Sequence, residues 1–440
     1  MAAVAPLSDD RHNPRNNFFA LVSHAGQFYA SECDLGNIAM VIYFYTGVNM
    51  KRTSRSAVSA FLTTATAVVV LTAASVSTTG VTANAVTTST NCATGTLSYS
   101  YKDAEAAANT VDPDTTPSSV PTTTSKVRNA NWKLVNKSSG ATLSQGLTDA
   151  SNGSFSACYD SSIPSSSIKI VFESASTNLW RVVTKNKSNA STYFDEHNLT
   201  SANFGGLNVD SAKAGAFKIV DTLSSLWGIN GNNSTDCWVA NQANGQCKAI
   251  TFAWGDAIDN GTNTDAGTAY WDLSGTKFVV IGSTSTQSMH TIVHEAGHAW
   301  QYLLNKGFPT VTNCGDHHFE TVSSKTCAWT EGWADAVAAW TLGDHRYVFD
   351  DGYYVNLTPN SNWATGPAVQ GHIGSTLLQL WAGPDQQTWD GTIKAMNGTV
   401  ISCFKQYYAA RPAAGLATDS AVQQILSNNT LSANDTSSCS

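Results

Sequence analysis

Charge is scarce in this sequence, and positive charge is the scarcer kind. Asp, Glu, Lys and Arg make up 13% of the 440 residues, with 24 Lys and Arg against 32 Asp and Glu, for a formal net charge of -8. This balance, without a local basic patch, would repel a phosphate backbone, so we expect no nucleic acid partner. Hydrophobic residues still make up 42% of the chain. The sequence therefore has enough apolar material for folded domains and is not of the disordered type.

Three familiar patterns are also missing. No pair of cysteines has the CxxC spacing of common structural zinc sites, which argues against the cysteines as zinc ligands. No GxxxxGK[ST] loop occurs, which excludes an ATP-dependent membrane protease. No EF-hand spacing occurs either, although Asp256, Asp259 and Asp265 are candidate calcium ligands, with a solvated turn as the alternative.

Residues 50–85 have the pattern of a secretory signal. A mostly apolar stretch, Ala57–Val76, is followed by Ala83-Asn84-Ala85, which fits the small-residue rule for signal cleavage. The basic residues that precede the stretch are Lys51, Arg52 and Arg55. We therefore predict export to the extracellular space and no stable membrane insertion after cleavage.

Residues 1–49 precede this signal. Because a signal needs its basic end near the true N-terminus, we interpret them as an upstream extension mis-assigned by start-codon choice. The alternative is a genuine extension, or a membrane anchor that uses the apolar run Ile38–Val48.

Cysteine number supports the same boundary. Of nine cysteines only Cys33 lies before the signal, and an even number in an exported chain predicts disulfides. Short loops close most readily, which favours Cys237–Cys247 and Cys314–Cys327. Cys92–Cys158 and Cys403–Cys439 follow by proximity in the sequence.

The region after the signal has a period of two. In Ile168–Phe172 the apolar residues alternate with polar ones, as in a half-buried strand, and Asn131–Val135 and Leu179–Val183 are similar. The turn and strand of Thr148–Phe155 resemble a signature of prealbumin-like and carboxypeptidase-regulatory sandwiches. We therefore expect an all-β sandwich as an accessory domain at 86–184, and a linker at 185–210, where the residues are polar and without period.

Helical spacing begins after the predicted linker. Apolar residues fall at steps of three and four up to Trp227, short strands follow at Ala249–Trp254 and Lys277–Ile281, and a second helix is expected at Thr286–Asn305. We expect these helices and strands to form one α+β domain at 211–440.

The second helix carries His294-Glu295-Ala296-Gly297-His298, an HExxH motif. Residues four apart lie on one helix face, so both imidazoles can reach one metal ion, and the motif predicts zinc. Glu295 lies about 100° around the helix from His294. Its carboxylate would stand beside the metal, where it can act as a general base.

A catalytic zinc needs a third protein ligand and one open position. His298 is followed by Ala299-Trp300-Gln301-Tyr302, which excludes the metzincin pattern. Glu331, in Thr330-Glu331-Gly332-Trp333-Ala334-Asp335, is the better candidate, on a helix capped by Thr330 that ends at Gly343. Asp335 lies one turn beyond Glu331 and can accept the spare ring N–H of a ligand histidine, favoured to be His294.

These two motifs resemble those of the gluzincin metallopeptidases, the thermolysin and fungalysin groups in particular. The resemblance implies a zincin-like catalytic domain, with Ala269, Tyr270 and Trp271 in the edge strand that pairs with extended substrate. Gln370–Trp381 is similar to a later helix of fungalysins, so His372 is favoured as the donor to the oxyanion, with His345 and Tyr347 as alternatives.

Other histidines received a different interpretation. His290 extends the series of the HExxH helix by one turn and is expected to support a ligand or lie at the surface. His317, His318 and Glu320 could compete as ligands, although they lie in the loop of a predicted disulfide.

The whole pattern predicts a monomeric, secreted zinc metallopeptidase that acts on extracellular proteins or peptides. The alternative is an exported binding or adhesion protein with a structural zinc site. Structural zinc is normally closed by four protein ligands, so a set of three with an adjacent glutamate argues for catalysis.

Overall fold

The computed structural model describes residues 89–229, 237–240, 242, 247–255, 267–315 and 317–439. These residues belong to one compact unit, Asn84–Ser440. The predicted signal at 50–85, the extension 1–49 and the calcium candidates Asp256, Asp259 and Asp265 lie outside the described residues. Within the described ranges, no helix is both long enough and apolar enough to cross a bilayer.

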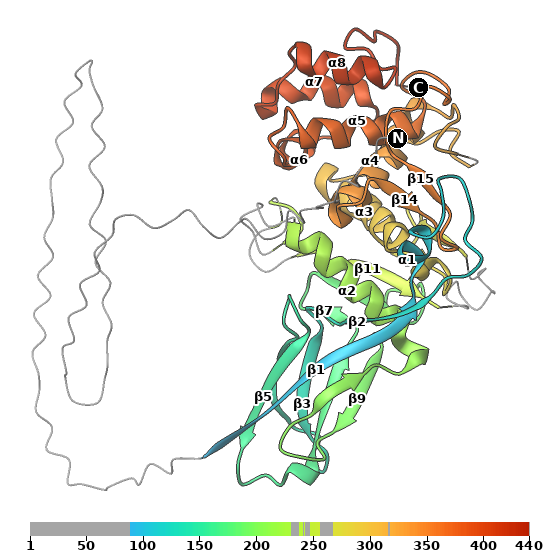
Figure 1. Ribbon diagram of the computed structural model, residues 1–440. Coiled ribbons are helices and arrows are strands. Elements are labelled where there is room, and N and C mark those ends of the chain that lie inside the picture. The colour runs from blue at the N-terminus through green and yellow to red at the C-terminus, as the bar shows by residue number, and fades with distance from the viewer. Residues whose placement is uncertain are drawn as a thin grey trace, which may run out of the picture. The chain divides into compact units, whose positions relative to one another are not determined.

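The N-terminal part is built from two four-stranded sheets (Figure 1). In the first, β1 (Thr90–Lys102) pairs antiparallel with β2 (Thr122–Lys126) and β5 (Ser154–Asp160), and parallel with β10 (Gly205–Asn208). The second is antiparallel, in the order β4-β3-β6-β9. Its strands are β3 (Asn131–Asn136), β4 (Thr142–Leu147), β6 (Ile168–Glu173) and β9 (Phe194–Asn198).

Side chains from the two sheets share one core. Phe155 of β5 meets Phe172 of β6 edge to face, with ring centroids 5.2 Å apart. The alternation in β6 is as predicted, with Ile168, Ile170 and Phe172 fully buried.

Residues 185–210, where a linker was expected, include β9 and β10. Both strands are largely exposed and polar, so their sequences do not show the alternation of apolar and polar residues that a buried face requires. The expected strand at Leu179–Val183 also forms, as β8 (Trp180–Val183), but it joins the sheet of the C-terminal part.

That sheet has the order β12-β13-β11-β8-β7. Its central strand β11 (Ile250–Trp254) is parallel to both β8 and β13 (Val279–Ile281), while β12 (Ala269–Trp271) forms one antiparallel edge and β7 (Ala175–Ser176) the other. A hairpin of β14 (Arg346–Val348) and β15 (Tyr354–Asn356) lies outside this sheet. The mixed content of helices and several sheets is compatible with an α+β fold.

Three helices form the centre of the C-terminal part: α2 (Ala214–Ile229), α3 (Met289–Asn305) and α4 (Lys325–Leu342), and α4 packs against both α3 and α5 (Gln370–Ala382) (Figure 1). Helix α3 begins after Ser288, whose Oγ accepts a hydrogen bond from the backbone N–H of Thr291. Three more helices complete the chain: α6 (Asp390–Met396), α7 (Phe404–Ala414) and α8 (Ser420–Asn428). A short helix, α1 (Ala104–Ala108), follows β1.

Helix α4 begins earlier than expected. Ser324 caps it, and Thr330 lies inside the helix, so the predicted Thr330 cap is wrong; the predicted end at Gly343, with φ of 64°, is confirmed. The helix extends further because its residues are already buried from Thr326 on. Gly297 explains the close approach of α3 to α4, since a Cβ there would lie 3.2 Å from Cα of Ala334.

All four predicted disulfides are confirmed: Cys92–Cys158, Cys237–Cys247, Cys314–Cys327 and Cys403–Cys439. Cys92 and Cys158 are register partners on β1 and β5, so their bridge joins neighbouring strands.

Candidate metal centre

Three side chains from two helices meet at one point. Helix α3 presents His294 and His298 on one face, with their Nε2 atoms 3.1 Å apart. Helix α4 supplies Glu331, whose Oε2 lies 3.2 Å from each of these nitrogens. All three are buried, and their ligand atoms lie close enough together to hold one metal ion. The spacings suit a tetrahedral ion with bonds of roughly 2.0–2.1 Å, and two imidazoles with one carboxylate are a donor set typical of catalytic zinc.

The two imidazoles strongly affect the pKa of the Glu331 carboxyl. Burial alone would raise the pKa of the Glu331 carboxyl, but the neighbouring imidazoles of His298 and His294 outweigh it and hold the pKa well below its ordinary value. The carboxylate is therefore ionised and ready to act as a ligand.

Glu295 stands beside the three residues without joining them. Its side chain is buried, it lines the same cavity, and its Oε2 has no hydrogen-bond partner among the described residues. Burial raises the pKa of this carboxyl, against the smaller opposing effect of His298 and His294. A buried carboxylate with a free oxygen is equipped to take a proton from water in the cavity.

Asp335 holds one of the imidazoles. Its Oδ1 lies 2.9 Å from Nδ1 of His294, and its Oδ2 accepts a hydrogen bond of 3.3 Å from Nε2 of Gln370. Since a carboxylate accepts hydrogen bonds, Nδ1 of His294 donates to Asp335, and this contact orients the ring so that Nε2 faces the cluster.

The cluster opens into a cavity of about 620 Å³. Strand β12 forms part of its wall through Ala269, Tyr270 and Trp271, at the edge of the five-stranded sheet. Aromatic and apolar side chains supply much of the remaining wall: Phe308, Val311, Phe319, Tyr347 and Phe349. Strand β12 is therefore the sheet edge that lies beside the cavity.

His372 does not reach the cavity. Its Nε2 lies 2.8 Å from the carbonyl oxygen of Ala364, and its ring packs on Trp363 at 5.5 Å. Gln370, two residues earlier on α5, is the residue that faces the cluster, and a step of two turns the side chain of His372 well away from it. The expectation that His372 donates to the oxyanion is therefore not supported by its position.

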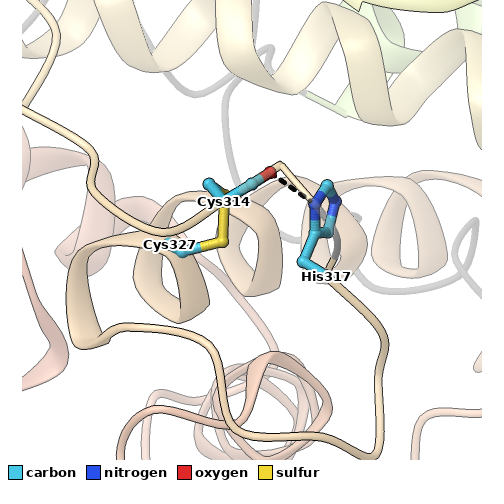
Figure 2. Close-up of side chains that lie close together, drawn as sticks. All are labelled: Cys314, His317 and Cys327. Carbon is cyan, nitrogen blue, oxygen red and sulfur yellow. Dashed lines mark hydrogen bonds between the residues drawn. A yellow bond between two sulfur atoms is a disulfide. The ribbon is translucent and has the colours of Figure 1, made fainter.

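His317, and not His372, lies beside the candidate metal ligands. Its Nε2 is 3.4 Å from Oε2 of Glu331, and its Nδ1 is 3.0 Å from the carbonyl oxygen of Cys314 (Figure 2). The contact with Glu331 raises the pKa of this imidazole. From the sequence, His317 was a competing ligand in the Cys314–Cys327 loop. The sequence does not show where this loop lies relative to Glu331.

The disulfide explains this position. Cys327 lies on α4 one turn before Glu331, so the bridge brings Cys314 and the following loop next to the carboxylate. Cys314, His317 and Cys327 are close enough together to resemble a second metal group. Because the two sulfur atoms are bonded to each other, 2.00 Å apart, they offer no thiolate to a metal (Figure 2).

The other residues considered for this site lie in different environments. Tyr347 lines the cavity and packs edge to face on His294 at 5.5 Å, and burial raises its pKa to about 12. His345 is exposed and does not line the cavity, whereas His318 does. His290 is fully buried and contacts Glu105 at 3.2 Å, so the alternative of a surface histidine is wrong.

Two comparisons with protein families identify the class of the molecule. Residues 92–216 match the mycolysin middle domain, and residues 231–430 match the mycolysin C-terminal domain. These domains point to a protease, whose substrates are proteins or peptides. Together they indicate the mycolysin family, a family of metalloproteases, and the candidate metal group of His294, His298 and Glu331 fits that class. No curated protein matches the chain.

Proposed function

We propose that the protein is a secreted zinc metallopeptidase of the gluzincin type. The observation that carries the proposal is the meeting of His294, His298 and Glu331 beside the free carboxylate oxygen of Glu295. In this proposal the first three residues hold zinc, and Glu295 is the general base. Zinc, when bound, supplies Lewis-acid chemistry at the scissile carbonyl and makes water more acidic.

Proton transfer, orientation of a ligand and substrate binding are assigned to residues of the chain. Glu295 accepts a proton from the attacking water and passes it to the nitrogen of the leaving amine. Asp335 fixes the tautomer of His294. Strand β12 binds extended substrate through its backbone, with Ala269, Tyr270 and Trp271 at the edge.

His317 takes the role for which His372 was favoured. Both of its ring nitrogens face acceptors, the Cys314 carbonyl and the Glu331 carboxylate, so an imidazolium with two N–H groups suits this place. From the cavity wall, its Nε2–H can turn from Glu331 to the oxyanion once the Glu331 carboxylate is bound to the metal.

The domain plan and localisation are part of the same proposal. The signal occupies residues 50–85, and a zincin-like catalytic domain occupies 211–440. The two four-stranded sheets form a prealbumin-like sandwich, which was expected at 86–184 but also includes β9 and β10 and so extends to Asn208. The phenylalanine contact between the sheets supports the sandwich. The four disulfides support export, since disulfides persist in oxidising compartments.

Cleavage of casein with and without a chelator tests the proposal. We expect cleavage that the chelator abolishes and zinc restores, and we expect Glu295→Gln to keep its zinc and lose cleavage. Zinc binding without any cleavage by the wild-type protein would instead support the exported binding protein. Wild-type cleavage rates in Glu295→Gln would contradict the role of Glu295.

A further inference from the structure

Glu105 lies far from the metal centre in the sequence but next to the helix that carries it. We propose that Glu105 is a positioning residue of this centre: it holds the N-terminal end of α3 and, through His290 and Tyr347, the orientation of His294. The inference rests on the proposed metal site and adds to it a residue from the part of the chain expected to be accessory.

One carboxylate oxygen makes most of the contacts. Oε1 of Glu105 accepts hydrogen bonds from the backbone N–H groups of Met289, at 2.6 Å, and His290, at 3.1 Å. The first N–H groups of a helix have no partner within the helix, and the positive end of its dipole favours a negative charge. Ser288 binds the N–H of Thr291, so Glu105 and Ser288 together cap the first turn.

Burial makes this contact dependent on charge. Glu105 is 8% exposed, and a carboxylate without compensation would be costly there. Lys218, 1% exposed, supplies an opposite charge from α2 and donates a hydrogen bond of 2.7 Å to the carbonyl of Gln287, just before α3. A carboxylate and an ammonium group therefore fix the same helix end from two sides.

A chain of contacts leads from Glu105 to the metal centre. Nδ1 of His290 lies 3.2 Å from Oε1 of Glu105, and the ring of His290 lies 6.0 Å from that of Tyr347. The ring of Tyr347 in turn lies 5.5 Å from that of His294, nearly at right angles. Ser288 also donates to the carbonyl of Val348, which ties β14, the strand of Tyr347, to the capped end of α3.

The two residues of the first contact come from different family-matched segments. Glu105 lies in the stretch that matches the mycolysin middle domain, and His290 lies in the stretch that matches the C-terminal domain. The middle segment therefore completes the catalytic unit and is not a detachable accessory to it.

The test compares Glu105→Gln with Asp419→Asn in the full chain. Asp419 caps α8 by accepting from the N–H groups of Ala421 and Val422, at 3.1 and 3.2 Å, and it does not line the metal cavity. Both variants replace a capping carboxylate by its amide. The readouts are the zinc dissociation constant, measured by competition with a chelator, and kcat and KM on a peptide substrate.

We expect Glu105→Gln to bind zinc about tenfold more weakly and to lower kcat more than it raises KM, as for other residues that orient metal ligands. We expect Asp419→Asn to keep wild-type values for all three. Wild-type zinc affinity and kcat in folded Glu105→Gln would overturn the proposal.

A second variant covers a failure to fold. His290→Gln keeps the helix cap and removes the ring between Glu105 and Tyr347, and the same losses are expected. If neither variant folds, the pair is purely structural and the proposal is wrong. Absence of zinc binding in the wild-type protein would instead contradict the proposed function itself, so the two failures are distinguishable.

Discussion

Oδ1 of Asp335 lies 2.9 Å from Nδ1 of His294, so an aspartate on α4 orients an imidazole on α3. Asp335 is fully buried, and Gln370 binds its other oxygen. The helix that brings Glu331 to the candidate metal position thus also fixes the direction of a second candidate ligand, one turn further along.

Asp335→Asn should weaken the metal site without unfolding the protein. The amide can turn its NH₂ group toward Nδ1, which favours the wrong tautomer of His294. We expect zinc affinity to fall by about 10- to 100-fold. Competition with a chelator measures this, and unchanged affinity would mean that Asp335 has no orienting role.

His317→Asn should affect turnover far more than metal binding. Loss of an oxyanion donor lowers kcat by about 10²- to 10³-fold in other peptidases. The matched control is His345→Asn, since His345 is exposed and does not line the cavity. Single-turnover kinetics and zinc content distinguish the outcomes: loss of zinc from His317→Asn would show a ligand, and a normal kcat would remove it from the mechanism.

Opening the Cys314–Cys327 bridge should reduce both stability and turnover. A loop with a sequence separation of 13 predicts a loss of about 3 kcal/mol on removal of the bridge. The double serine variant should also lower kcat, because the loop holds His317. Removal of Cys403–Cys439 is the control, with a similar loss of stability and a wild-type kcat. If both variants had the same kcat, the Cys314–Cys327 bridge would have no specific role in catalysis.

Lys218 predicts a rise in stability at alkaline pH. Burial lowers its folded-state pKa from 10.5 to about 8, so between these values the unfolded chain binds more protons than the folded one. The free energy of unfolding then rises with pH, by about 2 kcal/mol between pH 8 and 10. Urea unfolding of the wild type and Lys218→Met at several pH values measures how steeply the free energy of unfolding rises with pH. An equal rise in both proteins between pH 8 and 10 would contradict the low pKa of Lys218.

Local patterns in the sequence made part of this site predictable. His294 and His298 follow from helical spacing alone, and the same spacing relates Glu331 to Asp335. Cys237–Cys247 and Cys314–Cys327 followed from loop closure, because their partners are separated by 10 and 13 residues, and the other two pairs join the cysteines that remain nearest in the sequence. For β6, one buried face imposes the alternation that the sequence shows.

Contacts between distant segments could not be predicted in this way. Glu105 and His290 are 185 residues apart, and nothing in the short α1 segment indicates a partner. Strand β8 was recognisable as a strand, but its period does not say which sheet it joins. His372 and Gln370 show the same limit, since the face of α5 that meets α4 depends on packing.

The most direct test of the metal centre is a crystal structure of the zinc-loaded protein, measured at the zinc absorption edge. We expect one strong anomalous peak roughly 2.0–2.2 Å from Nε2 of His294, Nε2 of His298 and a carboxylate oxygen of Glu331, with a fourth position open to the cavity. A peak closed by four protein ligands, or no peak between these three side chains, would contradict the account.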